Sequence, residues 1–346
     1  MIAVVAVAAT QVAMAHSWRI NNDASKGAHF ASINEAMTSE QVVDGDTLYL
    51  DPGCVLSDDQ TITKAVTVIG TGWDFNNRPY VYAQVKNLKV TAAATKIIGL
   101  YITGTLYPVA DNVSIERCRI DGNISNNLSD YTKTYYNLKL MSSYLPSGYV
   151  YGSSSSSCYM FAIISNCIIR GGYNGLRGLT NATVTNNVIL FTNRNSYSSE
   201  TGYVLYLVNN SVFRNNIMMG VGSSYYNRME YSCSGNSFMN NCLSANGTTS
   251  YAAENANVCM NTYDLSAVFL NDGAVGGAAY KLCEGSPAKG AGVGGIDCGP
   301  YAEGSLYPFV TYGLPEHIPY FTEAVIPTRP TDGKVKVTLK IENQNR

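Results

Sequence analysis

A short pattern recurs along this chain and limits the folds that it can adopt. It consists of an apolar residue, a free position, Asn, then Asn or Cys, a second free position, and Ile, Leu or Met. Its copies are IERCRI at 115–120, with Arg for the first Asn, ISNCII at 164–169, VTNNVI at 184–189, FRNNIM at 213–218 and FMNNCL at 238–243. Buried amides are costly unless they are hydrogen-bonded, so the pattern needs a structural explanation.

The spacing of the copies indicates a solenoid. Their fourth positions follow one another at 49, 20, 29 and 25 residues, and are Cys118, Cys167, Asn187, Asn216 and Asn241. A constant local pattern at irregular spacing is typical of coils that share a core but carry loops of different length. The copies are short, β-branched and rich in Asn, unlike the amphipathic helix pairs of helical repeats. We therefore predict coils built of parallel β-strands.

The asparagines have a predicted role in such a solenoid. Equivalent residues of successive coils stack at about one strand spacing, ~4.8 Å. Asn tolerates the left-handed backbone conformation of a tight bend, and stacked amides hydrogen-bond along a column. We expect one Asn of each pair to turn the chain and point inward, forming an asparagine ladder. Cys118 and Cys167 would occupy the same column as small residues without the amide.

Composition argues against several functions. The chain has 346 residues, of which only 14% are charged, and its formal net charge is -2, so no basic surface for nucleic acid is expected. Its nine cysteines are an odd number, which leaves at least one unpaired if all pairing is internal. No Cys-x-x-Cys or Cys/His cluster indicates a zinc site. Several cysteines lie inside the repeat, which favours small buried side chains over a disulfide framework.

The first fifteen residues, MIAVVAVAATQVAMA, have the pattern of a secretory signal peptide. They are apolar and end in Ala13-Met14-Ala15, an A-x-A pattern that predicts cleavage before His16. The segment is too short to span a bilayer. The Lys or Arg that usually precedes such an apolar run is missing, and a buried first strand is the alternative reading. We expect a secreted or cell-surface protein, and a monomer.

The two ends of the repeat region resemble the right-handed parallel β-helix proteins of the pectin-lyase-like superfamily. The resemblance covers most of residues 18–300. It begins at WRINNDASKGAHFASINEAMTSEQVVDGDTLYLDPG, which is similar to that superfamily's first strand, capping helix and first coil, and Ser32-Ile33-Asn34-Glu35 fits a capping box. ITKAVTVIGTGW at 62–73 and IIGLYI at 97–102 match further coils. EGSPAKGAGVGGIDCGPYAEG at 284–304 is similar to the terminal segment of secreted bacterial β-helix proteins, including those of gut Bacteroidetes.

The resemblance implies an all-β fold, a right-handed parallel β-helix of nine or ten coils with an N-terminal capping helix and a β-rich C-terminal closing segment. The expected organisation is a signal peptide at 1–15, the β-helix at 16–300 and a closing tail at 301–346. In the tail, KVKVTLKIEN alternates apolar residues with lysines, as in a protected edge strand or a closing hairpin.

One interval breaks the rhythm of the repeat. Between Ile120 and Ile164 lies nearly twice the length of a coil, rich in tyrosine and containing the serine run at 153–157. It holds either one degenerate coil or an excursion from the flank of the solenoid. Long excursions are places where such folds carry function.

The superfamily includes polysaccharide lyases, polygalacturonases and pectin methylesterases, but their chemistry is not evident here. Hydrolysis needs paired carboxylates, and calcium-assisted lyases need an acidic metal cluster with a base. No catalytic motif of the superfamily matches, so no catalytic residue is assigned. No cofactor is expected, apart from Ca²⁺ if the protein is a lyase.

A second column of residues gives a candidate binding site. Counting back five positions from three copies of the pattern aligns Leu179, Val208 and Cys233, which places Arg177, Tyr206 and Tyr231 in register. With this column facing outward and Glu230 beside it, the guanidinium and aromatic faces suit sugar rings and uronate carboxylates. With the strand phase shifted by one residue, the tyrosines are core, and Leu205 and Glu230 face out instead.

Asp121 and Arg170 occupy the same position in two copies of the pattern and would be neighbours if those coils stack directly. Either they form a structural ion pair, or Arg170 binds a substrate carboxylate.

Three functions remain open from the sequence. The first is a secreted or cell-surface protein that binds polysaccharide through this column. The second is a structural or adhesion protein without enzymatic activity. The third is a lyase or hydrolase of acidic glycans, which Arg117, Arg119, Arg170 and Arg177 would favour.

Overall fold

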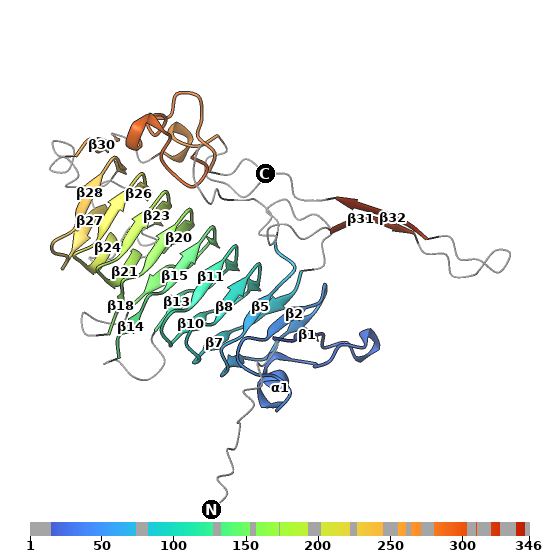
Figure 1. The fold of residues 1–346 in the computed structure, drawn as a ribbon. Coiled ribbons are helices and arrows are strands. Elements are labelled where there is room, and N and C mark those ends of the chain that lie inside the picture. The colour runs from blue at the N-terminus through green and yellow to red at the C-terminus, as the bar shows by residue number, and fades with distance from the viewer. Residues whose placement is uncertain are drawn as a thin grey trace, which may run out of the picture.

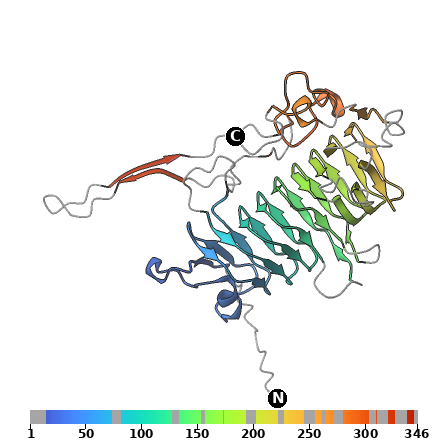
Figure 2. The same ribbon diagram turned by 180° about the vertical axis from the view of Figure 1, so that it is seen from behind.

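The chain is a right-handed parallel β-helix. The computed structural model describes residues 15–73, 82–126, 133–152, 157–172, 174–192, 202–221, 227–244, 255–260, 264–270, 280–302, 309, 320–325 and 337–342. Within these ranges it forms three parallel sheets of ten strands each and a separate two-stranded sheet. The sheets wind around one apolar core, with successive coils side by side along the axis (Figures 1 and 2). The predicted fold class is confirmed.

Each sheet runs the length of the solenoid. The first consists of β1 (Ser17–Ile20), β2 (Thr47–Leu50), β5 (Thr67–Ile69), β8 (Lys96–Ile98), β11 (Ser114–Glu116), β15 (Lys139–Met141), β19 (Ile163–Ser165), β22 (Thr183–Thr185), β25 (Val212–Arg214) and β28 (Ser237–Met239). The second consists of β3 (Val55–Leu56), β6 (Gln84–Val85), β9 (Tyr101–Ile102), β12 (Arg119–Ile120), β16 (Tyr144–Leu145), β20 (Ile168–Gly171), β23 (Val188–Thr192), β26 (Ile217–Val221), β29 (Cys242–Ser244) and β30 (Val258–Cys259).

The third sheet consists of β4 (Gln60–Ile62), β7 (Leu88–Val90), β10 (Leu106–Pro108), β13 (Ile124–Ser125), β14 (Tyr135–Tyr136), β17 (Val150–Tyr151), β18 (Tyr159–Met160), β21 (Asn174–Thr180), β24 (Gly202–Asn209) and β27 (Asn227–Tyr231). The long strand β21 pairs with both β17 and β18. Two of the coils therefore contribute two short strands each to the third sheet, where the other coils contribute one.

The asparagine ladder is present, and the two asparagines of each pair have different structural roles. The second Asn points inward: Nδ2 of Asn187 donates to Oδ1 of Asn216 at 2.9 Å, and Nδ2 of Asn216 donates to Oδ1 of Asn241 at 3.0 Å. Each amide also donates to a main-chain carbonyl, as Asn216 does to Val184 at 2.8 Å. Asn257 continues the column. Because these donors and acceptors are paired, the amides are tolerated in the core.

The first Asn of each pair turns the chain. Asn166, Asn186, Asn215 and Asn240 all have φ between 53° and 56°, in the left-handed region that Asn tolerates. Their side chains are not in the ladder. Oδ1 of Asn215 accepts from the main-chain N of Val293 at 3.0 Å, and Nδ2 of Asn240 donates to the carbonyl of Ala291 at 3.2 Å. The bend asparagines thus bind the C-terminal segment against the solenoid.

The cysteines behave as small core residues. None of the nine forms a disulfide, and six of them are buried. Cys118 and Cys167 lie in the ladder column, as predicted, with the main-chain N of Cys167 donating to Oδ1 of Asn187 at 2.8 Å. Burial raises the pKa of both thiols to about 12, which keeps them protonated and unreactive at neutral pH.

The irregular interval at 121–163 contains the degenerate coil that the sequence offered as one alternative. A degenerate coil is present, because β15 and β16 carry Leu140-Met-Ser-Ser-Tyr-Leu145 in register with the copy at 164–169. Ser143 takes the ladder position, where its Oγ accepts from the main-chain N of Cys118 at 3.1 Å. The third strands of this region are interrupted at 127–132 and 153–156, which lie outside the described residues.

The capping helix α1 (Ile33–Thr38) forms as predicted and packs beside β4 at the N-terminal end (Figure 1). Ser32 Oγ accepts from the main-chain N of Glu35 at 3.0 Å. Glu35 Oε2 in turn accepts at 2.6 Å from the main-chain N of Ala31, the residue before the N-cap, so the reciprocal bond of the capping box is shifted by one residue.

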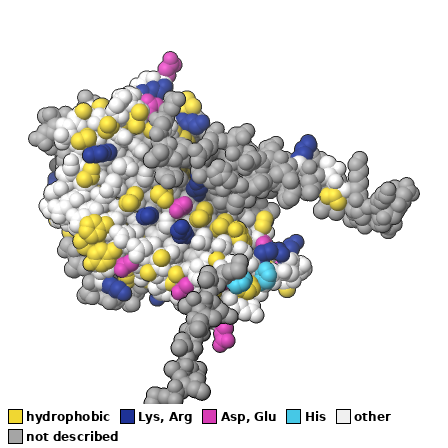
Figure 3. Space-filling view, in the orientation of Figure 1, with side chains coloured by type: hydrophobic (Ala, Val, Ile, Leu, Met, Phe, Trp, Pro, Cys, Tyr) yellow, Lys and Arg dark blue, Asp and Glu magenta, His cyan; other side chains and the backbone are white. Residues whose placement is uncertain are grey.

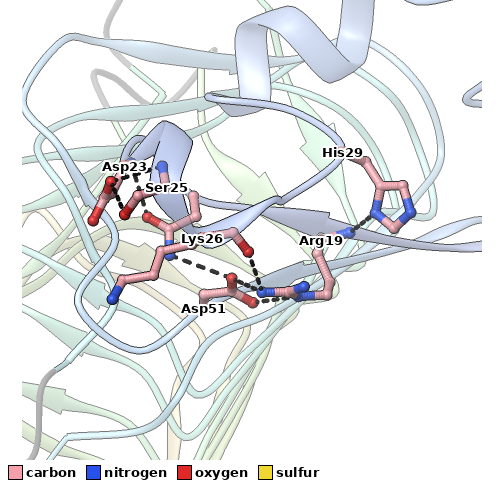
Figure 4. A network of polar contacts seen from close by, with 7 residues as sticks. Arg19, Asp23, Ser25, Lys26, His29 and Asp51 are labelled. Atoms are coloured by element: carbon pink, nitrogen blue, oxygen red, sulfur yellow. Dashed lines mark hydrogen bonds and ion pairs between the residues drawn. The ribbon is translucent and has the colours of Figure 1, made fainter. Parts of the chain in front are cut away.

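The loop before α1 is tied to the first coil by the polar network shown in Figure 4. Arg19 Nε donates to Asp51 Oδ1 at 3.0 Å, and its Nη2 bonds to the other carboxylate oxygen. Asp23 caps the short 3₁₀ helix at Ala24–Lys26.

A second apolar cluster lies outside the solenoid core, between the outer face of the second sheet and the C-terminal segment. Residues 264–270 and 280–302 cover that face, with 3₁₀ helices at Leu265–Ala267 and Val293–Gly295. Ile217 and Met219 face this cluster, whereas Met218 faces the solenoid core. Both faces of β26 are therefore buried, which explains why its residues Ile217 to Met219 are all apolar.

The tail forms a hairpin. β31 (Tyr320–Val325) and β32 (Thr338–Glu342) pair antiparallel with each other. The predicted amphipathic strand is therefore one arm of a hairpin. Residues 1–14 of the predicted signal peptide lie outside the described ranges.

Tyr159 gives the first testable prediction. Its ring is fully buried in the solenoid core, and its hydroxyl has no hydrogen-bond partner among the described residues. Because a buried hydroxyl without a partner is destabilising, we expect Tyr159→Phe to leave the free energy of unfolding unchanged or to raise it by about 1 kcal/mol. Denaturant midpoints of the two proteins check this. A clear loss of stability would show that the hydroxyl is bonded.

Candidate functional site

The predicted column lies on the outer face of the third sheet. The register of β17, β21, β24 and β27 aligns Tyr151, Arg177, Tyr206 and Tyr231 in successive coils. The residues before the first three, Val150, Leu176 and Leu205, are fully buried. Side chains alternate along a strand, so the column faces outward, and the shifted strand phase is wrong. We call these four residues the tyrosine–arginine column.

The column is a continuous stack. Cζ of Arg177 lies 4.6 Å from the ring centroid of Tyr151 and 4.6 Å from that of Tyr206. The rings of Tyr206 and Tyr231 are stacked, with centroids 5.5 Å apart and an interplanar angle of 6°. Tyr231 is the most exposed member, at 46%.

Mutual stacking changes what the column can do. Ring faces that lie against a neighbour are not open to a sugar ring, so the expectation that the aromatic faces of this column suit sugar rings is corrected for those faces. Guanidinium donors lie in the plane of the group, and contact with ring faces does not use them. The column is therefore suited to hydrogen bonding through its guanidinium and phenol groups more than to stacking on sugars.

Two neighbouring tyrosines extend the surface. Tyr203 lies 4.7 Å from Tyr231 between centroids, and Tyr149 meets Tyr151 edge-on at 5.7 Å. Burial raises the pKa of Tyr149, with the nearby phenol of Tyr151 adding to the shift. Tyr149 is thus a neutral hydrogen-bonding group at physiological pH.

Tyr149, Tyr151 and Tyr203 were not predicted as site residues. Counting back from Ile164 by the rule that located Arg177 gives Ser157 and not Tyr151, because this coil has more residues between Tyr151 and Ile164 than the next coil has between Arg177 and Val184. Only the pairing of β17 with β21 reveals its position.

Glu230 does not belong to the column. It pairs with Leu205, on the inner side of the sheet at its last strand, and its Oε1 accepts from Nδ2 of Asn236 at 2.7 Å. The expectation that it lies beside the guanidinium is corrected by strand alternation. An acid on the inner side of a terminal strand discourages further strands from adding there.

Asp121 and Arg170 are not neighbours, because strand β16 lies between β12 and β20. Asp121 instead accepts from Nε of Arg119 at 2.8 Å and from the hydroxyl of Tyr101 at 2.7 Å. Burial and this hydrogen bond raise the pKa of Tyr101 to about 12. The predicted ion pair between Asp121 and Arg170 is therefore wrong, since the degenerate coil separates them.

Arg170 lies instead under the C-terminal segment, next to the buried phenols of Tyr144 and Tyr280. Its charge opposes the effect of burial, which raises the pKa of both phenols. Arg170 is half-buried there and belongs to the second sheet, so it is not part of the tyrosine–arginine column on the third sheet.

Charged side chains are scattered among uncharged ones on the face shown in Figure 3. Among the described residues, no group of three or more His, Cys, Asp or Glu side chains is arranged to hold a metal ion. No helix in the described ranges is long and apolar enough to cross a membrane.

The fold places this chain in the class of parallel β-helix proteins. Comparison of the chain with protein-family models, with curated proteins and with solved structures gave no match.

Proposed function

We propose that this protein is an exported β-helix protein that binds polysaccharide at the tyrosine–arginine column, and that it belongs to the pectin-lyase-like superfamily. The observation that carries the binding proposal is Arg177, whose guanidinium is held between two tyrosine rings, each 4.6 Å away. A guanidinium that is already positioned loses less conformational entropy when it binds an anion. Its planar donors match the carboxylates of uronic acid sugars.

The surrounding phenols support the same ligand class. The rings of Tyr206, Tyr231 and Tyr203 contact one another and bring three phenols into one cluster. Phenols both donate and accept hydrogen bonds, which suits the hydroxyl groups of a sugar chain. A solenoid face also offers a straight row of such groups at regular spacing.

A structural or adhesion role is the second candidate. It is favoured by the stacking of Tyr206 on Tyr231, because ring faces packed on each other stabilise the outer sheet without any ligand. Catalysis on acidic glycans is the third. It needs an acid or base beside the column, and Glu230 lies on the other side of the sheet.

The proposal is tested by binding of the chain from His16 onward to a panel of polyuronates, glycosaminoglycans and neutral glycans. We expect saturable binding to carboxylated polymers. Arg177→Ala should weaken it at least tenfold, because a hydrogen bond to a charged group contributes about 1.5–3 kcal/mol. Arg177→Lys should restore part of the affinity through charge alone.

Arg214→Ala is the matched control, since Arg214 is an exposed arginine of β25 on the first sheet. It should bind as the unmodified protein does. Thermal unfolding of each variant separates loss of binding from loss of fold. No binding by the unmodified protein to any glycan would reject the proposal in favour of the structural role. Unsaturated products or new reducing ends would instead reveal an enzyme.

A further inference from the structure

The main-chain nitrogen of His16 occupies a site built around a buried acid. It donates to Oδ1 of Asp46 at 2.7 Å, and the carboxylate is 0% exposed. The other carboxylate oxygen accepts from Nε1 of Trp18 at 2.8 Å and from the main-chain N of Val43 at 3.0 Å. Burial alone would raise the pKa of Asp46, but these hydrogen bonds hold it below the ordinary value. The acid is therefore ionised at neutral pH.

This buried carboxylate has only neutral hydrogen-bond donors while residue 15 is attached. Asp51, the next acid along this edge, is paired with the Arg19 guanidinium (Figure 4). In the described part of the chain, no arginine or lysine side chain forms an ion pair with Asp46. The cationic group nearest to it is the imidazole of His16 when protonated, with Nδ1 at 3.8 Å. A buried charge with neutral donors alone is poorly compensated.

The same position is the predicted cleavage point. The A-x-A pattern at 13–15 predicts hydrolysis of the peptide bond between Ala15 and His16. Water adds across this bond, so that residues 1–15 leave with a carboxylate on Ala15 and His16 keeps a protonated α-amine. The carbonyl of His16 is held by the main-chain N of Thr47 at 2.8 Å, which fixes the residue on its other side.

We propose that Asp46 is the receptor for the new N-terminus: removal of residues 1–15 converts the His16 amide into an ammonium that forms a charged hydrogen bond with this buried carboxylate. A neutral contact becomes an ion pair without any movement of the chain. Processing thereby gives the buried carboxylate of Asp46 a charged partner. The proposal requires the cut to fall directly before His16. The proposal is independent of glycan binding.

The test compares two chains that both begin at His16, one with a free α-amine and one with the amine acetylated. The free amine should titrate above the usual 7.7–8.0. Its stabilising effect is then complete below pH ~7.7 and is lost as pH rises through the raised pKa. We expect the free-amine chain to unfold at a higher temperature at pH 7, and the difference to vanish at high pH.

Other titrating groups near this site are separated by variants. His16→Gln keeps the α-amine and removes the imidazole. Asp44 and Lys64 lie in the adjacent turns, where they bond to main-chain groups, and His29 contacts the Trp18 ring. None of these differs between the acetylated and free chains, so their titration cancels in the comparison.

Asp46→Asn should abolish the difference between the two chains. If that variant does not fold, the proposal is tested by measuring the pKa of the His16 α-amine in the unmodified chain. An amine with an ordinary pKa, or identical pH profiles for the free and acetylated chains, would overturn the proposal. An exported protein whose first residue is not His16 would overturn it as well.

Discussion

Asn216→Leu is expected to lower the free energy of unfolding by about 4 kcal/mol, although leucine fits the volume of a core position. Asn216 is fully buried, and its Oδ1 accepts from both the main-chain N and Nδ2 of Asn187, each at 2.9 Å. Its Nδ2 donates to Val184 and to Asn241. Leucine would leave these groups buried without partners, and each such group costs about 1–3 kcal/mol.

Hydrogen exchange and denaturant unfolding measure this effect. The amide of Asn187 should exchange much faster in Asn216→Leu, since it loses its acceptor. Asn187→Ser is the graded control, because serine serves the column at Ser143, where its Oγ accepts from Cys118. We expect Asn187→Ser to cost less than half as much. Equal stability of Asn216→Leu and the unmodified protein would show that the ladder is dispensable.

Gly148→Ala is expected to destabilise the protein by about 3 kcal/mol, because successive coils touch there through their backbones. A Cβ at Gly148 would lie 1.8 Å from the carbonyl oxygen of Gly122, and one at Gly122 would lie 2.5 Å from that of Gly104. Backbone atoms cannot move aside without separating the coils. Glycine is therefore needed in this column for close approach.

The matched control is Gly172→Ala, since a Cβ at Gly172 would meet no atom within 4 Å. We expect its melting temperature to stay within about a degree of the unmodified protein, as for most surface substitutions. A similar loss in both variants would show that the close approach to Gly122 is not its cause. A loss confined to Gly148→Ala would establish the steric contact.

The fold was largely predictable from the sequence because its core repeats. Each copy of the pattern places one apolar residue inward, one residue at the bend and one in the ladder, and these are local requirements. The glycine column was missed because its members, Gly104, Gly122 and Gly148, lie outside the pattern and are separated by unequal intervals. Its signal is the contact between coils, which no local pattern records.

The candidate site was predicted only where coils follow one another without interruption. The alignment of Arg177, Tyr206 and Tyr231 was correct because a constant offset joins them to the pattern. Tyr151 was missed because the degenerate coil does not keep the constant offset, and Asp121 and Arg170 were wrongly paired because that coil lies between them. Glu230 was misplaced because sequence proximity does not tell which side of a strand a residue faces.

The sequence by itself therefore determined a parallel β-solenoid with an internal ladder, since burial and hydrogen bonding act identically on each repeated segment. Only the tertiary structure decided how the outside is used. It stacks the exposed rings face to face and turns the bend asparagines toward the C-terminal segment. It also brings His16 to Asp46, thirty residues away. These contacts depend on which coil lies next to which, and loop lengths set that independently of the repeating pattern.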